Sequence, residues 1–236
     1  MAEKNEFELD SWEHLENEII ACRLCPRLVE WRETVARIRR KAFLSQEYWG
    51  KAVPGFGDPK AKLLVVGLAP GAHGSNRTGR MFTGDASGDF LYRELHLTGF
   101  ANQPFSSSRQ DGLELKDVFI TAVNRCVPPD NKPTPEEMRT CRPYLLREMA
   151  MLNPVKGIVV LGRIAFDNIL QIIGSDHAGD QKPVFGHGFF YETGAGKPWL
   201  LCSYHPSRQN TQTGRLTVEM FDQIWRTARE RLDSPV

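Results

Sequence analysis

This 236-residue chain contains four short apolar runs separated by helical patterns, and this alternation constrains its fold more than any other feature. Short apolar runs without polar alternation are typical of strands buried on both faces of a parallel sheet. The runs cover residues 62–68, 118–123, 157–161 and 199–203. Helical patterns cover residues 88–97, 135–152, 163–173 and 216–232, with two more helices expected over 11–20 and 26–40. The sequence therefore predicts an α/β protein, a three-layer α/β/α sandwich around a short four-stranded parallel sheet.

Composition is that of an ordinary globular protein. The hydrophobic fraction is 41%, the charged fraction is 25% and the net charge is +1. No apolar run reaches the roughly 18 residues that a transmembrane helix needs, and the acidic N-terminus lacks the hydrophobic region of a signal peptide. We therefore expect one domain over residues 1–236, a cytoplasmic location, no membrane association and a monomer.

A glycine-rich segment, residues 67–88, follows the first predicted strand and reads GLAPGAHGSNRTGRMFTGDASG. Glycines let the backbone approach a ligand closely. The segment carries one carboxylate, Asp85, together with cationic side chains that include Arg77 and Arg80. Such a loop is suited to a site that binds a polyanion and performs one proton transfer on it. The alternative is a plain surface connection between a strand and a helix.

Polar residues also follow the other predicted strands. Asn124 comes after the second strand, Arg163 after the third, and His205 after the fourth. Ligands of open α/β sheets bind at the carboxyl ends of the strands. The topology therefore predicts that these residues share a cleft with the glycine-rich segment. Residues 175–191, which are rich in glycine and weakly patterned, are expected to form a loop or hairpin.

Five cysteines are present, and four of them have a spacing that suggests a metal site. Cys22 and Cys25 form a C-x2-C pair, and Cys126 and Cys141 flank a proline-rich segment. In a cytosolic protein this pattern favours a metal over disulfides. Four thiolates suit zinc or an iron–sulfur cluster, and four unrelated buried thiols are the alternative. Cys202 lies in an apolar run and is expected in the core.

Several motifs together resemble the uracil-DNA glycosylase superfamily, specifically its type b branch, also known as family 5. The motifs are GLAPGAHGSNRTGR with FTGDASG, CVPPDNKPTPEE, LGRIA at 161–165 and SYHPSRQNTQTGRLT at 203–217. The resemblance covers residues 22–232 and implies the same α/β/α fold. It also implies an enzyme that excises damaged bases from DNA by hydrolysing the N-glycosidic bond, and a 4Fe–4S cluster bound by Cys22, Cys25, Cys126 and Cys141.

Two departures from the neighbouring iron–sulfur branch bear on the substrate. Leu68 stands where those relatives carry an acidic residue, and Ala122 stands where they carry an asparagine. Both differences match the type b branch and imply a broad range that includes uracil, hypoxanthine and other deaminated or modified bases. No lysine in the matched motifs stands out as a Schiff-base nucleophile, so we expect a monofunctional glycosylase that leaves an abasic site.

The resemblance also suggests roles for single residues. Asp85 would orient the hydrolytic water, His205 would donate a hydrogen bond to the leaving base, and Asn131 would hold the water or the base. Phe82 would stack on a base flipped out of the duplex, beside Ala69 and Gly71. The alternatives are a helix N-cap for Asp85, a structural histidine for His205, a turn residue for Asn131 and a core aromatic for Phe82.

The residues expected to contact DNA belong to two groups. Three arginines would bind phosphates without reading sequence, and a polar loop would enter the minor groove beside the flipped nucleotide. They are Arg77, Arg80 and Arg163 in the first group, and Ser207, Arg208, Gln209 and Asn210 in the second. The basic segment 22–42 could add a phosphate footprint or form a solvated helix face.

Two other classes of function compete with a glycosylase. A metal-containing DNA-binding module would use the cysteines and arginines but leaves Asp85, Asn131 and His205 without a purpose. A nucleotide-binding enzyme would use the glycine-rich segment for phosphate, but the chain has neither G-x-x-x-x-G-K-[ST] nor the G-x-G-x-x-G fingerprint there.

Overall fold

The computed structural model describes residues 11–174 and 183–234, and a six-stranded sheet lies at its centre. The strand order is β1-β3-β2-β4-β6-β5. The four middle strands are parallel and confirm the predicted runs. They are β2 (Leu63–Gly67), β3 (Val118–Ala122), β4 (Gly157–Leu161) and β6 (Trp199–Ser203).

Two short antiparallel strands extend the predicted sheet at its edges. β1 (Phe56–Gly57) pairs with β3, and β5 (Phe190–Tyr191) pairs with β6. β5 falls within the segment 175–191 that was predicted as a loop or hairpin, of which residues 175–182 lie outside the described residues.

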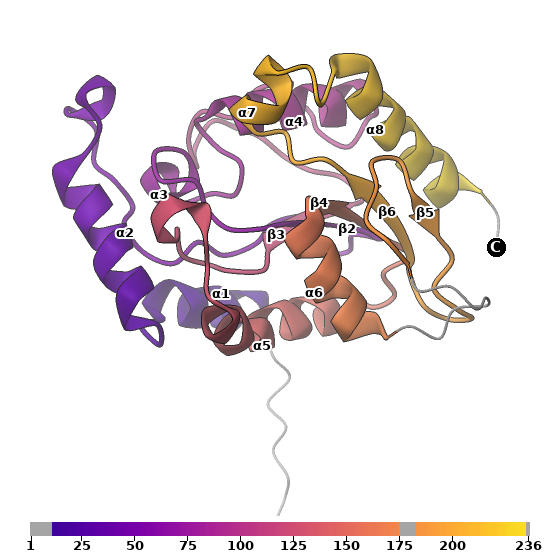
Figure 1. The fold of residues 1–236 in the computed structure, drawn as a ribbon, viewed down its shortest axis with the longest axis horizontal. Helices are drawn as coiled ribbons and strands as arrows, with labels where there is room; N and C mark the ends of the chain where they lie inside the picture. The colour runs from indigo at the N-terminus through magenta and orange to yellow at the C-terminus, as the bar shows by residue number, and fades with distance from the viewer. Residues whose placement is uncertain (1–10, 175–182, 235–236) are drawn as a thin grey trace, which may run out of the picture.

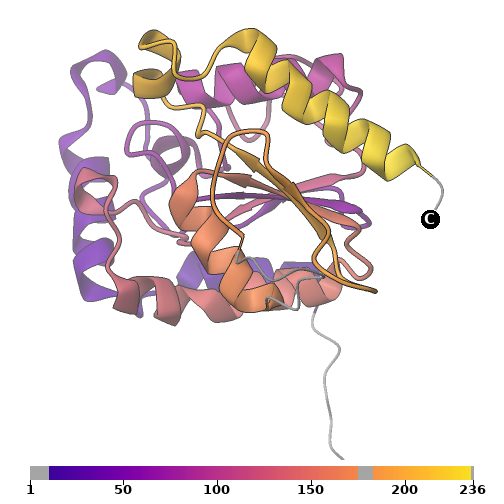
Figure 2. The same cartoon turned by 45° about the vertical axis from the view of Figure 1, so that its right-hand side comes forward.

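Helices cover both faces of the sheet, as Figures 1 and 2 show. One face carries α4 (Ala86–Leu97) and α8 (Val218–Asp233), and the other carries α1 (Trp12–Ala21), α5 (Pro135–Met151) and α6 (Arg163–Ile173). The predicted three-layer sandwich is thus confirmed. Among the helices of the described residues, none is both long and apolar enough to cross a membrane.

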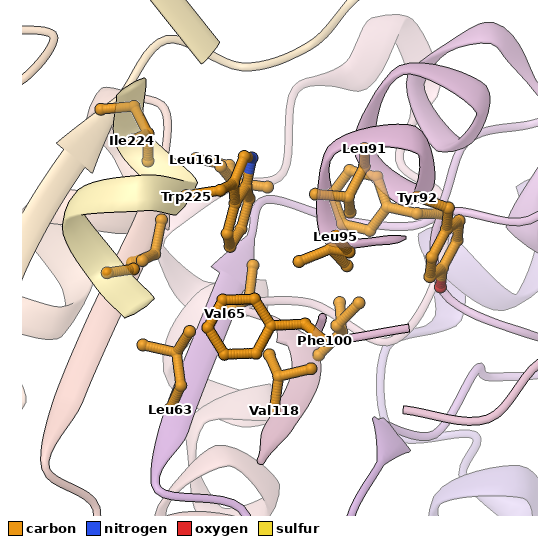
Figure 3. Packing of buried hydrophobic residues seen from close by; sticks show 14 of the residues in the cluster. Leu63, Val65, Leu91, Tyr92, Leu95, Phe100, Val118, Leu161, Ile224 and Trp225 are labelled. Carbon is orange, nitrogen blue, oxygen red and sulfur yellow. The ribbon is translucent and has the colours of Figure 1, made fainter. Parts of the chain in front are cut away.

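Successive residues of each central strand belong to opposite cores because side chains alternate along a strand. Leu63 and Val65 of β2 pack with Trp225 of α8 and the apolar face of α4 (Figure 3). Leu64 and Val66 pack on the opposite side, in the cluster that includes α5 and α6 residues. Both faces of the sheet are therefore dry, which explains the unbroken apolar runs of these parallel strands.

Local chemistry sets where several helices begin. Thr134 caps α5 in a capping box with Glu137, and Pro135 occupies the first turn. Thr217 caps α8, and Asp85 caps α4. Short helices that the apolar pattern did not predict are α3 (Ser75–Thr78), α7 (Arg208–Gln212) and the 3-10 turns η1 (Lys41–Phe43) and η2 (Pro129–Asn131).

The N-terminal helices bring the cysteines against the body of the fold. α2 (Pro26–Ile38) follows α1 after a short turn, and a third apolar cluster joins residues of α1, α2 and α5. Cys126 and Cys141 are buried members of this cluster, and Cys22 and Cys25 pack against it. Cys202 lies instead in the core beneath α5 and α6, as predicted.

A buried ion pair ties α5 to the end of β3. The Arg125 guanidinium donates to Glu148 Oε2 at 2.6 Å, and Thr121 Oγ1 donates to the same oxygen at 2.6 Å. The two charged side chains are 1% and 2% exposed. Water cannot reach either charge in the folded protein, so each charge is stabilised mainly by the other.

Replacing Glu148 with Gln removes the counter-charge and leaves the Arg125 guanidinium buried. We expect the free energy of unfolding, measured in urea, to fall by about 3–5 kcal/mol. The matched control is Asp222→Asn, which removes the partner of exposed Arg226 on α8 and should cost less than about 1 kcal/mol. Similar losses for the two variants would contradict this account.

Candidate functional site

A cavity of about 340 Å³ lies where the segments that follow β2, β3 and β6 meet. It brings together every residue predicted as catalytic or base-binding, and two of the residues predicted to enter the minor groove. These are Ala69, Gly71, Phe82, Asp85, Asn131 and His205, with Ser207 and Gln209. The expected convergence is therefore present for His205 and the glycine-rich segment, but Asn124 and Arg163, which were expected in the same cleft, do not line this cavity.

Asp85 caps a helix and also lines the cavity, so the two interpretations that the sequence left open are compatible. It is the N-cap of α4, and its Oδ1 accepts hydrogen bonds from the backbone N–H groups of Ser87 at 3.0 Å and Gly88 at 3.1 Å. Among the described residues no hydrogen bond reaches Oδ2, which leaves this oxygen available to water. Burial raises the pKa of the carboxyl, and the two N–H groups oppose that rise.

Glycine backbone makes room for the Asp85 side chain. A Cβ built on Gly74 would lie 1.8 Å from Oδ2, and one built on Gly71 would lie 2.9 Å from it. Carbon cannot approach oxygen at the first of these distances. Gly74 is thus required by the position of the carboxylate, which explains one glycine of the segment 67–88.

Phe82 forms a wall of the cavity in a strained conformation. Its φ is 51°, a region that bulky residues rarely adopt and that costs of order 1–3 kcal/mol. Gly88 makes room for this conformation, because a Cβ there would lie 1.8 Å from the Phe82 carbonyl oxygen. The ring stacks on the His205 imidazole, with centroids 5.7 Å apart and planes inclined by 29°.

His205 lies two residues after the end of β6 and contributes an uncharged ring to the cavity. Burial lowers the pKa of its imidazole to about 4, so the ring is neutral near pH 7. Asn210 fixes the local backbone by donating its Nδ2–H to the His205 carbonyl at 2.8 Å. A neutral imidazole can still donate one hydrogen bond.

Asn131 reaches the cavity from the turn η2. Its φ is 56° and that of Asp130 is 53°, left-handed values that Asn and Asp tolerate better than most residues. Asn131 is exposed and lines the cavity. Asn131 is therefore both a turn residue and a residue of the cavity, so its two interpretations are compatible.

The structure changes the interpretation of Arg77 and Arg80. Both are buried, and their guanidinium groups are occupied within the protein. Arg77 donates to the carbonyls of His73 and Gly84, each at 2.7 Å. Arg80 pairs with Asp111 at 2.7 Å. We interpret them as braces of the glycine-rich segment rather than as the predicted phosphate contacts.

Other predicted DNA contacts lie at the surface. Arg163 begins α6 and is exposed, with Asp167 at 3.6 Å. Arg208 and Gln209 are exposed on the first turn of α7, which Ser207 caps. By contrast, the basic segment 22–42 is partly neutralised, since Arg27 pairs with Glu137 at 2.7 Å.

Sequence reasoning missed Ser75 and Met81, which also line the cavity. Their place in the segment 67–88 was the available signal, but neither residue type indicated a role. Asn124, which was expected in the cleft, is instead buried and donates its Nδ2–H to the Glu137 carbonyl at 3.2 Å. It therefore links the end of β3 to the first turn of α5.

The four cysteines predicted as ligands gather around one small apolar pocket with Leu28 and Tyr144. Burial and the neighbouring thiols raise the pKa of Cys25 to about 11. Backbone N–H of Arg125 donates to Cys141 Sγ at 3.3 Å. The described residues contain no group of three or more His, Cys, Asp or Glu side chains positioned to hold a metal ion, so the cluster stays a prediction.

Comparison with known proteins gives a consistent result. A sequence profile of the Uracil DNA glycosylase superfamily matches residues 54–229. A type-5 uracil-DNA glycosylase of Thermus thermophilus is 53% identical over 89% of this chain and 94% of its own length. Those of Mycobacterium tuberculosis and Pyrobaculum aerophilum are 52% and 45% identical, each over 90% of this chain and over 78% and 89% of their own lengths.

The low pKa of His205 makes stability depend on pH in a defined direction. The unfolded chain takes up a proton below an ordinary pKa of about 6.5, whereas the folded ring does so only near pH 4. The stabilisation is therefore complete above about pH 6.5 and is lost as the pH falls toward 4. An NMR titration of the His205 ring should give a midpoint near 4, and a midpoint near 6.5 would contradict the burial argument.

Proposed function

Because this chain belongs to the uracil-DNA glycosylase superfamily, we propose that it is a DNA repair glycosylase of broad range. It hydrolyses the N-glycosidic bond of uracil and of other deaminated or modified bases, such as hypoxanthine, and leaves an abasic site. The observation that carries the proposal is the cavity in which Asp85, Asn131 and His205 meet beside the Phe82 ring.

The target base reaches the cavity by leaving the duplex. A base inside the stack cannot present its glycosidic bond to Asp85, so it must be flipped out. The cavity of about 340 Å³ offers an aromatic wall, Phe82, for the face of the base. Every base has such a face, so stacking tolerates different bases.

Asp85 prepares the water. Cleavage of a glycosidic bond passes through an oxocarbenium-like sugar cation. Oδ2 orients a water toward that cation and accepts its proton, while Oδ1 remains bonded to the start of α4. The negative charge of the carboxylate also favours the cation. Asn131 lies across the same cavity and holds the water or the base.

His205 acts on the leaving base as a neutral donor. Negative charge develops on the base as the bond breaks, and a hydrogen bond aimed at that charge strengthens in the transition state. The low pKa of the ring supports donation without full protonation of the base.

The base-facing wall supports a broad range. Leu68 lines the cavity at the position where the neighbouring branch carries an acidic residue. An apolar side chain there discriminates weakly between bases, because specific rejection requires polar groups that a wrong base would leave unpaired.

The exposed start of α7 is suited to enter the duplex. Ser207 Oγ accepts from the Asn210 N–H at 3.3 Å, which fixes the turn beside the cavity. Arg208 and Gln209 project from it with long polar side chains that can fill the gap left by the base. Arg163, on α6, would contact phosphate.

The cysteines fit a 4Fe–4S cluster bound by Cys22, Cys25, Cys126 and Cys141. Their convergence on one dry pocket and the N–H donor to Cys141 Sγ support this ligand set. When bound, the cluster supplies a structural cross-link between the start of α2, the end of β3 and α5. No step of the hydrolysis requires it.

Asp85→Asn should abolish most base release without unfolding the protein. Asn is an equally good N-cap but a poor base, and loss of general base catalysis lowers rates by about 10²–10⁴-fold. The measurement is single-turnover release from labelled duplexes that contain uracil, hypoxanthine or a modified pyrimidine. A near-normal rate for the variant would contradict the assignment.

Gly74→Ala is the matched variant, since it keeps the carboxylate but displaces it, and it should lose activity while binding DNA.

Release of several bases by the wild type supports the broad range. No release of any base by the folded, iron-loaded wild type would favour the DNA-binding module instead.

Arg208→Ala should weaken excision from duplex DNA more than excision from single strands, because only a duplex has a gap to fill. The ratio of the two single-turnover rates measures this effect. Arg163→Ala is the control, since loss of a phosphate contact should weaken both reactions alike. Equal losses on both substrates for Arg208→Ala would count against an insertion role.

A further inference from the structure

Arg32 on α2 is a buried cation without an anionic partner. Its residue exposure is 1%. Among residues 11–174 and 183–234 no carboxylate forms an ion pair with it, and its Nε has no hydrogen-bond partner. A guanidinium cannot lose its charge in a protein, and a buried charge is expensive unless it is compensated.

The charges around Arg32 do not supply that compensation. Glu33, its neighbour on α2, pairs with Arg23 at the surface. Arg125 is a second buried cation, and Glu148 already serves it. Neither Glu33 nor Glu148 therefore pairs with Arg32, and the ionisable group that its guanidinium does contact is the thiol of Cys126.

Arg32 faces these thiols directly. Its Nη1 lies 2.9 Å from Cys126 Sγ, and its Nη2 donates to the Cys22 carbonyl at 2.9 Å. A neutral thiol is a weak acceptor and carries no charge. A thiolate bound to iron is both a better acceptor and a negative group.

We infer that Arg32 is the counter-charge of the iron–sulfur cluster and that it sets the cluster's reduction potential through Cys126. The inference rests on the proposed cluster but goes beyond it, since the ligand set alone assigns Arg32 nothing. A cation beside a cluster sulfur stabilises the reduced state, which is more negative by one charge, and so raises the potential.

The test compares Arg32→Met with Arg37→Met in iron-loaded protein. Methionine keeps an unbranched apolar stem and removes the charge. Arg37 lies on the same helix but is exposed, with Thr34 as its contact. Redox titration followed by visible absorbance should give a lower potential for Arg32→Met and an unchanged one for Arg37→Met. Arg32→Lys, which keeps the charge, should restore much of the difference.

The possible outcomes distinguish failure of the role of Arg32 from failure of the cluster proposal. Wild-type protein that lacks iron and sulfide, or that holds zinc, would overturn the cluster, whatever its base release. A loaded Arg32→Met protein with the wild-type potential would overturn the role of Arg32 alone. If Arg32→Met assembles no cluster, Arg32→Lys must assemble one, because charge is the property invoked; failure of both would overturn the inference.

Discussion

The rest of the site depends on the close packing of Asp85 and Phe82 against glycine backbone. A Cβ at Gly74 would overlap Asp85 Oδ2, and a Cβ at Gly88 would overlap the Phe82 carbonyl. The path of the segment 67–88 therefore fixes the carboxylate and the aromatic wall together. Arg77 and Arg80 stabilise that path with hydrogen bonds to the Gly84 carbonyl and to Asp111. A segment rich in glycine is thus kept in one conformation, as a site must be if its groups are to be preorganised.

Helix α2 connects the cysteines with that segment. The Arg32 side chain bonds to Cys126, and the Arg32 carbonyl accepts from Asn76 Nδ2 at 3.2 Å. Asn76 is fully buried, and its own carbonyl accepts from Gly50 at 3.0 Å. A cross-link that fixes α2 thereby also fixes the start of α3 in the glycine-rich segment. This chain of contacts gives a physical reason why the proposed cluster, which would touch no reacting atom, would still affect base excision.

Particular residues show which features could be predicted from sequence. The central strands could be predicted, because burial on both faces removes polar alternation. The Thr134 cap could be predicted as well, because its chemistry is local. The edge strand β1 could not be predicted, since its two residues depend on pairing with β3. Arg77 and Arg80 were expected to contact DNA phosphates, but their guanidinium groups bond inside the protein, to Gln46 and Asp111, which each lie 31 positions away in the chain. Burial that depends on such distant partners leaves no local signal.

Burial shifts the pKa values of the two ionisable groups of the cavity in opposite directions. Both shifts favour the neutral form of the group. Burial lowers the pKa of His205 and raises that of Asp85. In the proposed reaction a neutral imidazole donates to the base, but Asp85 must be ionised to take a proton from water. The N–H groups of Ser87 and Gly88, aided by the positive end of α4, stabilise the charged carboxylate. Capping the helix is therefore compatible with the catalytic role that we propose for Asp85. It opposes the desolvation that the cavity imposes, and it leaves Oδ2 to the water.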